Sequence, residues 1–253
     1  MAPVTSPAPV LSVVIPVYNE APNLDQLHRE FTDALAAWGR SYELILVDDG
    51  STDESFERLK AIQTRDARVR VIQFRRNFGQ TAAFAAGFAY ARGQLIATAD
   101  ADLQNDPRDL PAMISRVEGG ADLVCGWRKD RKDDFLTRSV PSVIANRLIG
   151  VVSGVNVHDV GCSLKIFRAE VVKPLKLSPG MHRYLPQLAS QLGDRVTEVV
   201  VNHRPRRFGQ SKYGLSRTFR VASDLVKLRR LMREAVDPAT PAPRLYEVAE
   251  VLE

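Results

Sequence analysis

Residues 11–20 read LSVVIPVYNE, and this stretch decides the fold. Its first seven residues form a short apolar run, which is typical of a strand buried on both faces of a parallel sheet. The polar residues 18–20 end the strand, and apolar residues then recur at helical spacing. This spacing predicts a helix over residues 21–38 that Gly39 ends. A buried strand that leads directly into a helix indicates an α/β fold.

The same alternation continues through the first half of the chain. Further strands are predicted over residues 43–47, 69–74, 94–99 and 122–126, and helices over residues 54–66, 78–92 and 107–119. After residue 127 the pattern loosens, with helices expected near 135–152, 182–191 and 215–235 and strands near 163–167 and 195–201. Strands that alternate with helices predict a mostly parallel sheet with helices on both faces.

The chain of 253 residues is long enough to bury a substantial core. We expect a flexible N-terminus over residues 1–10 and an α/β domain over residues 11–213. A basic amphipathic helix is predicted over residues 214–236. The tail, residues 237–253, contains three prolines and is expected to dock loosely or fray.

Composition narrows the environment and the partners. The net charge of +5 suits anionic partners such as nucleotide diphosphates and phospholipids, whereas nucleic-acid binding would rest on net charge alone and is not predicted. Two distant cysteines form neither a metal pattern nor a disulfide framework, and we expect free, buried thiols. The sequence predicts no signal peptide and contains no run of about 18 apolar residues. We therefore expect a cytoplasmic protein, in peripheral contact with the cytoplasmic face of a membrane.

Three polar clusters follow predicted strands. They are residues 18–20, the pair Asp48 and Asp49, and residues 100–102. In open α/β sheets, ligands bind beyond the carboxyl ends of the strands. Segments that are distant in the sequence are therefore expected to meet at one edge of the sheet and to form a binding site there.

Asp100 and Asp102 are two carboxylates separated by one residue in a turn after a strand. Mg²⁺ and Mn²⁺ take oxygen ligands, usually one or two carboxylates together with substrate phosphates. Gln104 adds a neutral oxygen, so the three side chains form a candidate metal site. The alternative is an ordinary capping turn ahead of the helix that begins at Pro107.

Three motifs in this order resemble the family 2 inverting glycosyltransferases, which have the nucleotide-sugar-binding, Rossmann-like fold called GT-A. They are residues 12–20, 47–51 and 100–104. Further matches at residues 77–80, 126–128, 159–163 and 206–213 resemble the branch that includes dolichyl-phosphate mannose synthase and bacterial polyprenyl-phosphate sugar transferases. The resemblance covers about residues 10–220. It implies transfer of a sugar from a UDP- or GDP-sugar to a polyprenyl phosphate, with inversion and with a divalent metal.

The resemblance also implies roles for individual residues. Tyr18 is expected near the ring of the base, Glu20 at the ribose hydroxyls and Asp49 at the base edge. Asp102 and Gln104 are expected to hold the metal. The full set implied to line the nucleotide-sugar site is Pro16, Tyr18, Glu20, Val47, Asp49, Asp100, Ala101 and Ser211, with Asp100 close to the metal or the sugar.

The implied catalytic set adds basic residues to Asp102. Arg128 suits a donor or acceptor phosphate, because a guanidinium pairs with phosphate in a bidentate way. Arg206, Ser211 and Lys212 are expected in an arm that closes on the diphosphate, or else in a solvated basic loop. His182 and His203 flank polar segments and are weaker candidates for contact with donor or acceptor.

Asp159 completes the catalytic set, and its role depends on the acceptor. A sugar hydroxyl needs a carboxylate to take its proton, and Asp159 would be that base. A lipid phosphate needs none, because the second pKa of a phosphate monoester is about 6. Asp159 would then position other groups or orient Arg128. An alternative hypothesis from another functional class is that the protein binds a nucleotide or a phospholipid without catalysing a reaction.

Transferases of this branch often carry transmembrane helices after the segment that matches residues 211–213, and none is predicted here. The basic helix predicted nearby could lie on an anionic membrane, pack on the domain or dock to a membrane subunit. The identity of the sugar stays open. The sequence allows a homo-oligomer without requiring one.

Overall fold

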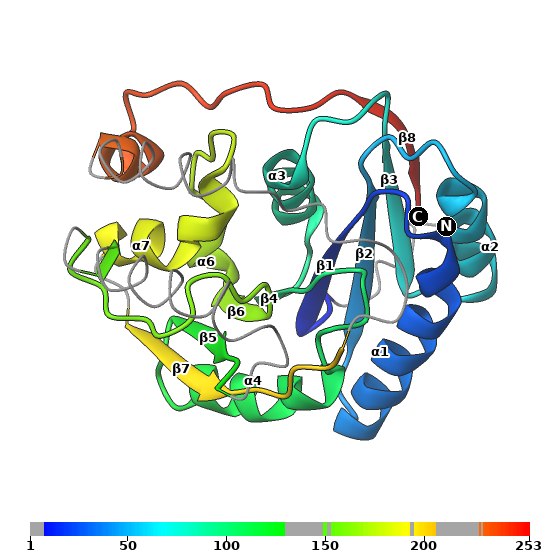
Figure 1. Cartoon of the computed structure of the whole chain (residues 1–253), viewed down its shortest axis with the longest axis horizontal. Helices are drawn as coiled ribbons and strands as arrows, with labels where there is room; N and C mark the ends of the chain where they lie inside the picture. The colour runs from blue at the N-terminus through cyan, green and yellow to red at the C-terminus, as the bar shows by residue number, and fades with distance from the viewer. Residues whose placement is uncertain (1–7, 130–148, 151–152, 193–194, 206–227, 229) are drawn as a thin grey trace, which may run out of the picture.

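The computed structural model describes residues 8–129, 149–150, 153–192, 195–205, 228 and 230–253. Within these residues, eight strands form one sheet in the order β7-β5-β6-β4-β1-β2-β3-β8 (Figure 1). The strands are β1 (Leu11–Val17), β2 (Tyr42–Asp48), β3 (Val69–Phe74), β4 (Leu95–Thr98), β5 (Leu123–Trp127), β6 (Lys165–Arg168), β7 (Val196–Val200) and β8 (Val248–Leu252). β4, β1, β2 and β3 run parallel, whereas β6 and β8 are antiparallel to their neighbours. The predicted mostly parallel sheet is confirmed.

Helices cover both faces of the sheet, as predicted. The apolar sides of α1 (Leu24–Trp38), α2 (Ser55–Arg65) and α4 (Leu110–Glu118) pack into one core cluster. On the other face, α3 (Gln80–Tyr90), α6 (Ala169–Val172) and α7 (Leu185–Ala189) pack into a second cluster. The described residues also include short 3₁₀ turns: η1 (Ala21–Asn23), η2 (Pro107–Asp109), η4 (Met181–Tyr184) and η5 (Ser190–Leu192). The sheet therefore separates two apolar layers.

Helix α3 lies unusually close to the sheet. A Cβ atom added to Gly87 would stand 2.1 Å from Cγ1 of Val14 on β1, so no larger residue fits without movement. The helix is rich in alanine, and its buried residues include Ala82, Ala83 and Ala86. Small residues on this face let the helix approach the strand, which fixes the position of the N-terminal end of α3 relative to the carboxyl end of β1.

The C-terminal tail is ordered where loose docking was expected. β8 pairs antiparallel with β3, and Tyr246 stacks on Phe74 with 5.0 Å between ring centroids. The prolines that suggested fraying lie at 238–243, before the strand begins. β8 covers the backbone of β3 that would otherwise be a sheet edge. The tail is therefore part of the domain.

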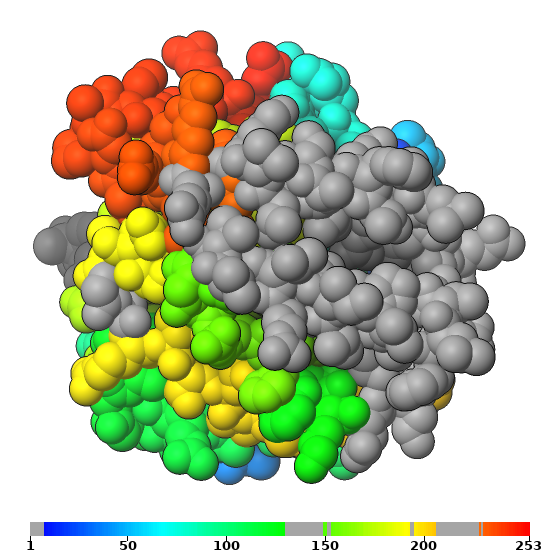
Figure 2. Space-filling model, turned by 60° about the vertical axis from the view of Figure 1, so that its left-hand side comes forward, coloured from blue at the N-terminus to red at the C-terminus, as the bar shows by residue number. Residues whose placement is uncertain are grey.

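The described end of the predicted amphipathic helix packs on the domain. Leu228, Met232 and Ala235 are at most 3% exposed and belong to the same core cluster as α3. The backbone N–H of Lys176 donates to the carbonyl of Ala235 at 2.9 Å, and the orange segment lies against the yellow one in Figure 2. The rest of that helix, and most of the one expected near 135–152, lie outside the described residues. No helix within the described part of the chain is long and apolar enough to cross a membrane.

Cys125 and Cys162 are buried, free thiols, as the sequence predicts.

Candidate active site

The carboxyl ends of three neighbouring strands form the floor of the candidate site. β1 lies between β4 and β2, and all three run in the same direction. The loops that follow them carry the three polar clusters at 18–20, 48–49 and 100–102. The sheet therefore brings these clusters to one edge, as the sequence predicts.

The loops after β1 and β2 are fastened to each other. The backbone N–H of Asn19 donates to Oγ of Ser51 at 3.0 Å, and the N–H of Thr52 returns a bond to Oδ1 of Asn19 at 2.8 Å. Asn19 has a φ of 55°, a left-handed conformation that few residues other than glycine adopt. Such strain commonly accompanies binding loops, and here the hydrogen bonds hold it in place.

The residues expected at the nucleotide differ in their accessibility. Pro16, Tyr18 and Glu20 are half-buried at the edge of the site. Val47 is completely buried in the core cluster that includes α3, so its side chain serves packing. Contact of the first three with a nucleotide stays a prediction.

Asp49 binds the N-terminal end of α3. Its carboxylate accepts hydrogen bonds from the backbone N–H groups of Phe78 at 2.7 Å and Gly79 at 2.9 Å and from Nδ2 of Asn77 at 3.0 Å. Burial raises the pKa of Asp49 to about 6, the two backbone N–H bonds oppose that rise, and the charge of Asp48 adds to it. The first backbone N–H groups of this segment thus bind a carboxylate of the protein itself. Contact of Asp49 with a base edge stays a prediction.

The turn after β4 is held in an unusual conformation. Oδ1 of Asp102 accepts the N–H of Gln104 at 3.1 Å, and Leu103 between them has a φ of 64°. Oδ1 of Asn105 accepts the N–H of Asp100 at 2.9 Å. The cap of the next helical segment is Asp106, which accepts the N–H of Arg108 at 3.1 Å. Asp100 and Asp102 are therefore not needed as helix caps.

The same turn fits a divalent cation. Burial raises the pKa of Asp100, and the negative charge of Asp102 raises it further. A cation between these two carboxylates would relieve their repulsion. Within the described residues, no three His, Cys, Asp or Glu side chains form a complete protein cage. A pair of carboxylates that leaves the other positions to phosphate and water is the arrangement usual for Mg²⁺.

Gln104 and Ala101 both make contacts within the protein. Nε2 of Gln104 donates to the carbonyl of Arg204 at 3.4 Å, which ties the turn to the segment that follows β7. Ala101 is 4% exposed and packs in the core on the side of α1 and α4. Whether Gln104 contributes an oxygen to a metal stays a prediction.

Arg128 and Asp159 form a two-pronged ion pair near the end of β5. Nε of Arg128 lies 2.7 Å from Oδ2 of Asp159, and its Nη2 lies 3.0 Å from Oδ1. The two side chains are only 16% and 4% exposed. Burial opposes the charge on Arg128, but the Asp159 carboxylate outweighs burial and raises the pKa of Arg128. A positive charge is thus held in one orientation.

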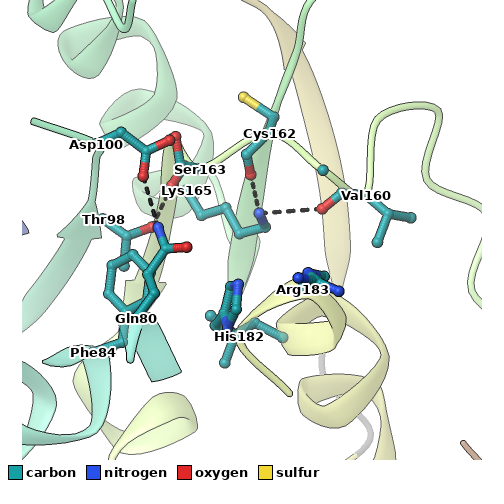
Figure 3. Close-up of a pocket in the computed structure, with 12 residues that line it drawn as sticks. Gln80, Phe84, Thr98, Asp100, Val160, Cys162, Ser163, Lys165, His182 and Arg183 are labelled. Carbon is teal, nitrogen blue, oxygen red and sulfur yellow. Dashed lines mark hydrogen bonds between the residues drawn. The ribbon is translucent and has the colours of Figure 1, made fainter. Parts of the chain in front are cut away.

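A pocket opens between α3, η4 and the ends of β4 and β6 (Figure 3). One side presents Asp100 and Gln80, whose Nε2 donates to Oδ1 of Asp100 at 2.8 Å. Another side presents Lys165, His182 and Arg183. The full lining is Gln80, Phe84, Thr98, Asp100, Val160, Gly161, Cys162, Ser163, Lys165, His182, Arg183 and Leu185.

Sequence reasoning missed Lys165 and Arg183 and considered His182 only weakly. Lys165 is 3% exposed, and its ammonium donates to the carbonyls of Cys162 and Val160. A lysine inside an apolar strand was a signal that could have been noticed, since lysine is almost never fully buried without a partner. Arg183 carried no such signal.

Three expected residues lie outside the described part of the chain: Arg206, Ser211 and Lys212. Their roles at the diphosphate stay predictions. The segment just before them is described, and Arg204 forms an ion pair with Glu30 at 2.6 Å.

Comparison with known proteins agrees with this geometry. The family model described as glycosyl transferase family 2 matches residues 12–175. Dodecaprenyl-phosphate galacturonate synthase of Rhizobium johnstonii is 46% identical over 232 residues, which are 90% of this chain and 69% of that protein. Undecaprenyl-phosphate 4-deoxy-4-formamido-L-arabinose transferase of Salmonella typhimurium is 39% identical over 222 residues, 87% of this chain and 68% of that protein. The chain belongs to glycosyl transferase family 2.

Solved structures support the fold. Glucosyl-3-phosphoglycerate synthase from Mycobacterium tuberculosis, in complex with Mn²⁺, UDP and glucosyl-3-phosphoglycerate, matches with a TM-score of 0.68 and 18% identity. The match covers 88% of this chain and 80% of that one. The GT-A fold expected from the sequence is confirmed.

Proposed function

We propose that the protein transfers a sugar from a nucleotide-sugar to a polyprenyl phosphate lipid, with inversion and with help from a divalent metal. The observation that carries this proposal is the agreement between two relatives, 46% and 39% identical to this chain. Their names include different sugars but the same kind of acceptor, a polyprenyl phosphate. The acceptor is thus the feature that a third member of the group would share.

The geometry suits a nucleotide-sugar donor. The loops after β1 and β2 would receive the nucleoside, with Tyr18 and Glu20 at the edge of the site. Asp100 and Asp102 would hold Mg²⁺ or Mn²⁺, as the Mn²⁺ and UDP in the structural neighbour also suggest. The metal would neutralise the diphosphate as it leaves. The fixed turn at Leu103 keeps the two carboxylates in place before the donor binds.

The Arg128–Asp159 pair favours a phosphate acceptor. A phosphate oxygen is already anionic near neutral pH, so it can attack C1 of the sugar without losing a proton to the protein. Arg128 carries a fixed charge that suits a phosphate, and Asp159 orients it. The bond between C1 and the donor diphosphate breaks as the new bond forms on the opposite face, which inverts the configuration at C1.

The competing acceptor is a saccharide or another alcohol, for which Asp159 would be the base. Both oxygens of Asp159 accept hydrogen bonds from Arg128, which disfavours proton transfer to this carboxylate. Under our proposal, Asp159→Asn should lower turnover only partly, by loosening Arg128. Abolished turnover on an alcohol acceptor, with no need for lipid, would support the alternative.

The test is a donor screen with short-chain polyprenyl phosphate and Mn²⁺. UDP-glucose, UDP-N-acetylhexosamines, UDP-galacturonate and GDP-mannose would be compared, with Asp102→Ala as the inactive control. Sugar that enters the lipid phase, and does so only with intact Asp102, is the expected result. Donor hydrolysis without lipid product would favour the alcohol acceptor, and donor binding that is indifferent to metal would favour the non-catalytic binder.

A lipid acceptor also implies contact with a membrane surface or with a membrane subunit. The buried Leu228, Met232 and Ala235 show that the described end of the basic helix uses its apolar side for packing. Sedimentation with anionic vesicles, with and without polyprenyl phosphate, would show whether lipid alone recruits the protein. Lack of sedimentation with either would favour the membrane subunit.

A further inference from the structure

The pocket between α3 and η4 lies where the sugar of the donor is expected. The strands follow one another in the order β2, β1, β4, β6 across the sheet. The first two carry the loops assigned to the nucleoside, and β4 carries the carboxylates assigned to the diphosphate and metal. The pocket comes next, between the ends of β4 and β6. This spatial order matches the order of the parts along a nucleotide-sugar.

The chemistry of this pocket is more basic than a neutral sugar requires. Apolar Phe84, Val160 and Leu185 offer a surface for a sugar ring, and Thr98 and Ser163 offer hydroxyls. The charged lining consists of one carboxylate, Asp100, and the cations Lys165 and Arg183, and His182 lies next to Arg183. Hydroxyl and amide groups are sufficient to bind a neutral hexose, whereas an acidic sugar also needs a partner for its carboxylate.

The protein itself holds one of the two cations, and the other remains. The ammonium of Lys165 is buried and donates to the carbonyls of Cys162 and Val160. Arg183 forms no ion pair with a carboxylate anywhere in the described part of the chain. It is only partly exposed and lines the pocket. A guanidinium in such a place is suited to a carboxylate of the ligand.

Hydrogen bonds and a ring contact hold His182 on the side of the pocket that also carries Arg183. Its Nδ1 lies 2.7 Å from Oγ1 of Thr81 on α3, and its ring lies 6.3 Å from that of Phe84. The hydroxyl of Thr81 also accepts the backbone N–H of Gly180 at 2.9 Å. These bonds fasten η4, and Arg183 with it, to the helix that also positions Gln80.

We propose that the donor sugar is a hexuronic acid, and that Arg183 binds its carboxylate in this pocket. The inference rests on the proposed function and names the class of sugar that it leaves open. It agrees with the relative named for galacturonate, whereas the relative named for a formamido-arabinose shows that the family does not require an acidic sugar.

The first test is a set of matched donors that differ only at C6. UDP-galacturonate is compared with UDP-galactose, UDP-glucuronate with UDP-glucose, and GDP-mannuronate with GDP-mannose. Binding is measured by calorimetry with Mn²⁺ and without acceptor. At least one uronate should bind about 10- to 100-fold more tightly than its neutral partner, the range of a charged hydrogen bond. Equal or tighter binding of the neutral partner in all three pairs would overturn the proposal.

The second test asks whether Arg183 causes the preference for a uronate donor. Arg183→Gln should remove most of the uronate preference and leave the affinity for the neutral partner within about 3-fold. The control is Arg195→Gln, because Arg195 is an exposed arginine just before β7, at the opposite edge of the sheet. An equal loss for both members of a pair would mean that Arg183 supports the fold, and thermal unfolding of each variant would show this directly.

The two proposals can fail separately. Uronate-selective binding without transfer to polyprenyl phosphate would keep the sugar assignment and reject the acceptor. Transfer of a neutral hexose to the lipid, with no preference for a uronate, would keep the proposed function and reject the acidic sugar.

Discussion

The amino ends of the parallel strands form one edge of the central sheet, and their carboxyl ends form the other. The two edges differ in how their charged side chains are partnered. At the amino edge, Glu43 accepts hydrogen bonds from Oγ of Ser12 at 2.6 Å and from the N–H of Arg92 at 2.7 Å, and it pairs with Arg70 at 3.3 Å. Arg70 also pairs with Glu253, which directly follows β8. At the carboxyl edge, Asp100 and Asp102 repel each other, and Arg183 has no carboxylate partner within the described residues.

From this difference we infer that the amino edge contributes mainly to stability and the carboxyl edge mainly to function. Charges at the amino edge satisfy one another, so this edge fastens β1, β2, β3 and β8 together. At the carboxyl edge, a bound cation would relieve the repulsion between Asp100 and Asp102, and the strained residues Asn19 and Leu103 also lie there. Perturbed titratable groups and backbone strain gather at functional sites for this reason. Changes at one edge should therefore alter catalysis, and changes at the other should alter folding.

The largest effect is expected from Asp102→Asn at the carboxyl edge. Loss of one of the two carboxylates that would hold the metal should lower kcat/KM for sugar transfer by about 10³-fold, because a catalytic metal stabilises the transition state by several kcal/mol. The midpoint of thermal unfolding should change little. The control, Glu118→Gln, removes an exposed carboxylate at the end of α4. A loss under 10-fold at saturating Mn²⁺ would remove Asp102 from the metal site.

The next effect is expected from Glu43→Ala at the amino edge. It removes a buried partner of Arg70 and should lower the free energy of unfolding by about 3 kcal/mol, as for other broken buried pairs. Chemical denaturation measures this loss, and transfer activity per folded molecule should stay unchanged. If activity falls while stability holds, the two edges are not separable in the way we describe.

A third effect depends on pH and concerns Asp49. Its pKa is raised from 3.8 to about 6, so its protonated form is favoured in the fold. Its contribution to stability is full below about pH 4 and is lost as the pH rises to about 6. The difference in unfolding temperature, wild type minus Asp49→Asn, should therefore fall across this interval.

Asp53 provides the matched contrast to Asp49. Burial acts to raise its pKa, but hydrogen bonds from Ser55 and Ala21 outweigh burial and lower it. The corresponding difference for Asp53→Asn should therefore increase as the pH rises toward about 4. If the Asp49 difference also increased with pH, the N–H groups of α3 would have to dominate over burial.

The smallest effect is expected from Arg92→Gln, again at the amino edge. Arg92 pairs with Glu253 at 2.7 Å, but both side chains are about half exposed. Solvent screens such pairs, so the free energy of unfolding should fall by about 0.5 kcal/mol or less in chemical denaturation. A loss as large as that from Glu43→Ala would mean that the exposed pair, and not the buried one, holds β8.

The sequence predicts the first five strands to within one residue at each end, because short apolar runs between polar loops mark them clearly. It does not predict β8, since a strand at the sheet edge depends on β3 offering it a partner. The order of strands and helices along the chain was enough to predict that the three polar loops lie at one edge of the sheet. The pocket could not, because Lys165 and Arg183 come from separate segments that only tertiary packing places on one wall. The hydrogen bonds between Asp49 and the start of α3 likewise could not be predicted from the sequence.

The start of α3 joins the loops after β2 and β4 into one unit. Residues 77–79 bind Asp49, which follows β2, and the adjacent Gln80 binds Asp100, which follows β4. The close contact between Gly87 and Val14 keeps the helix from shifting to suit a new ligand. An engineer who grafts another relative's donor preference onto this scaffold would need to exchange residues 77–80 together with the loops after β2 and β4, since replacing any one of them leaves the others matched to the old arrangement.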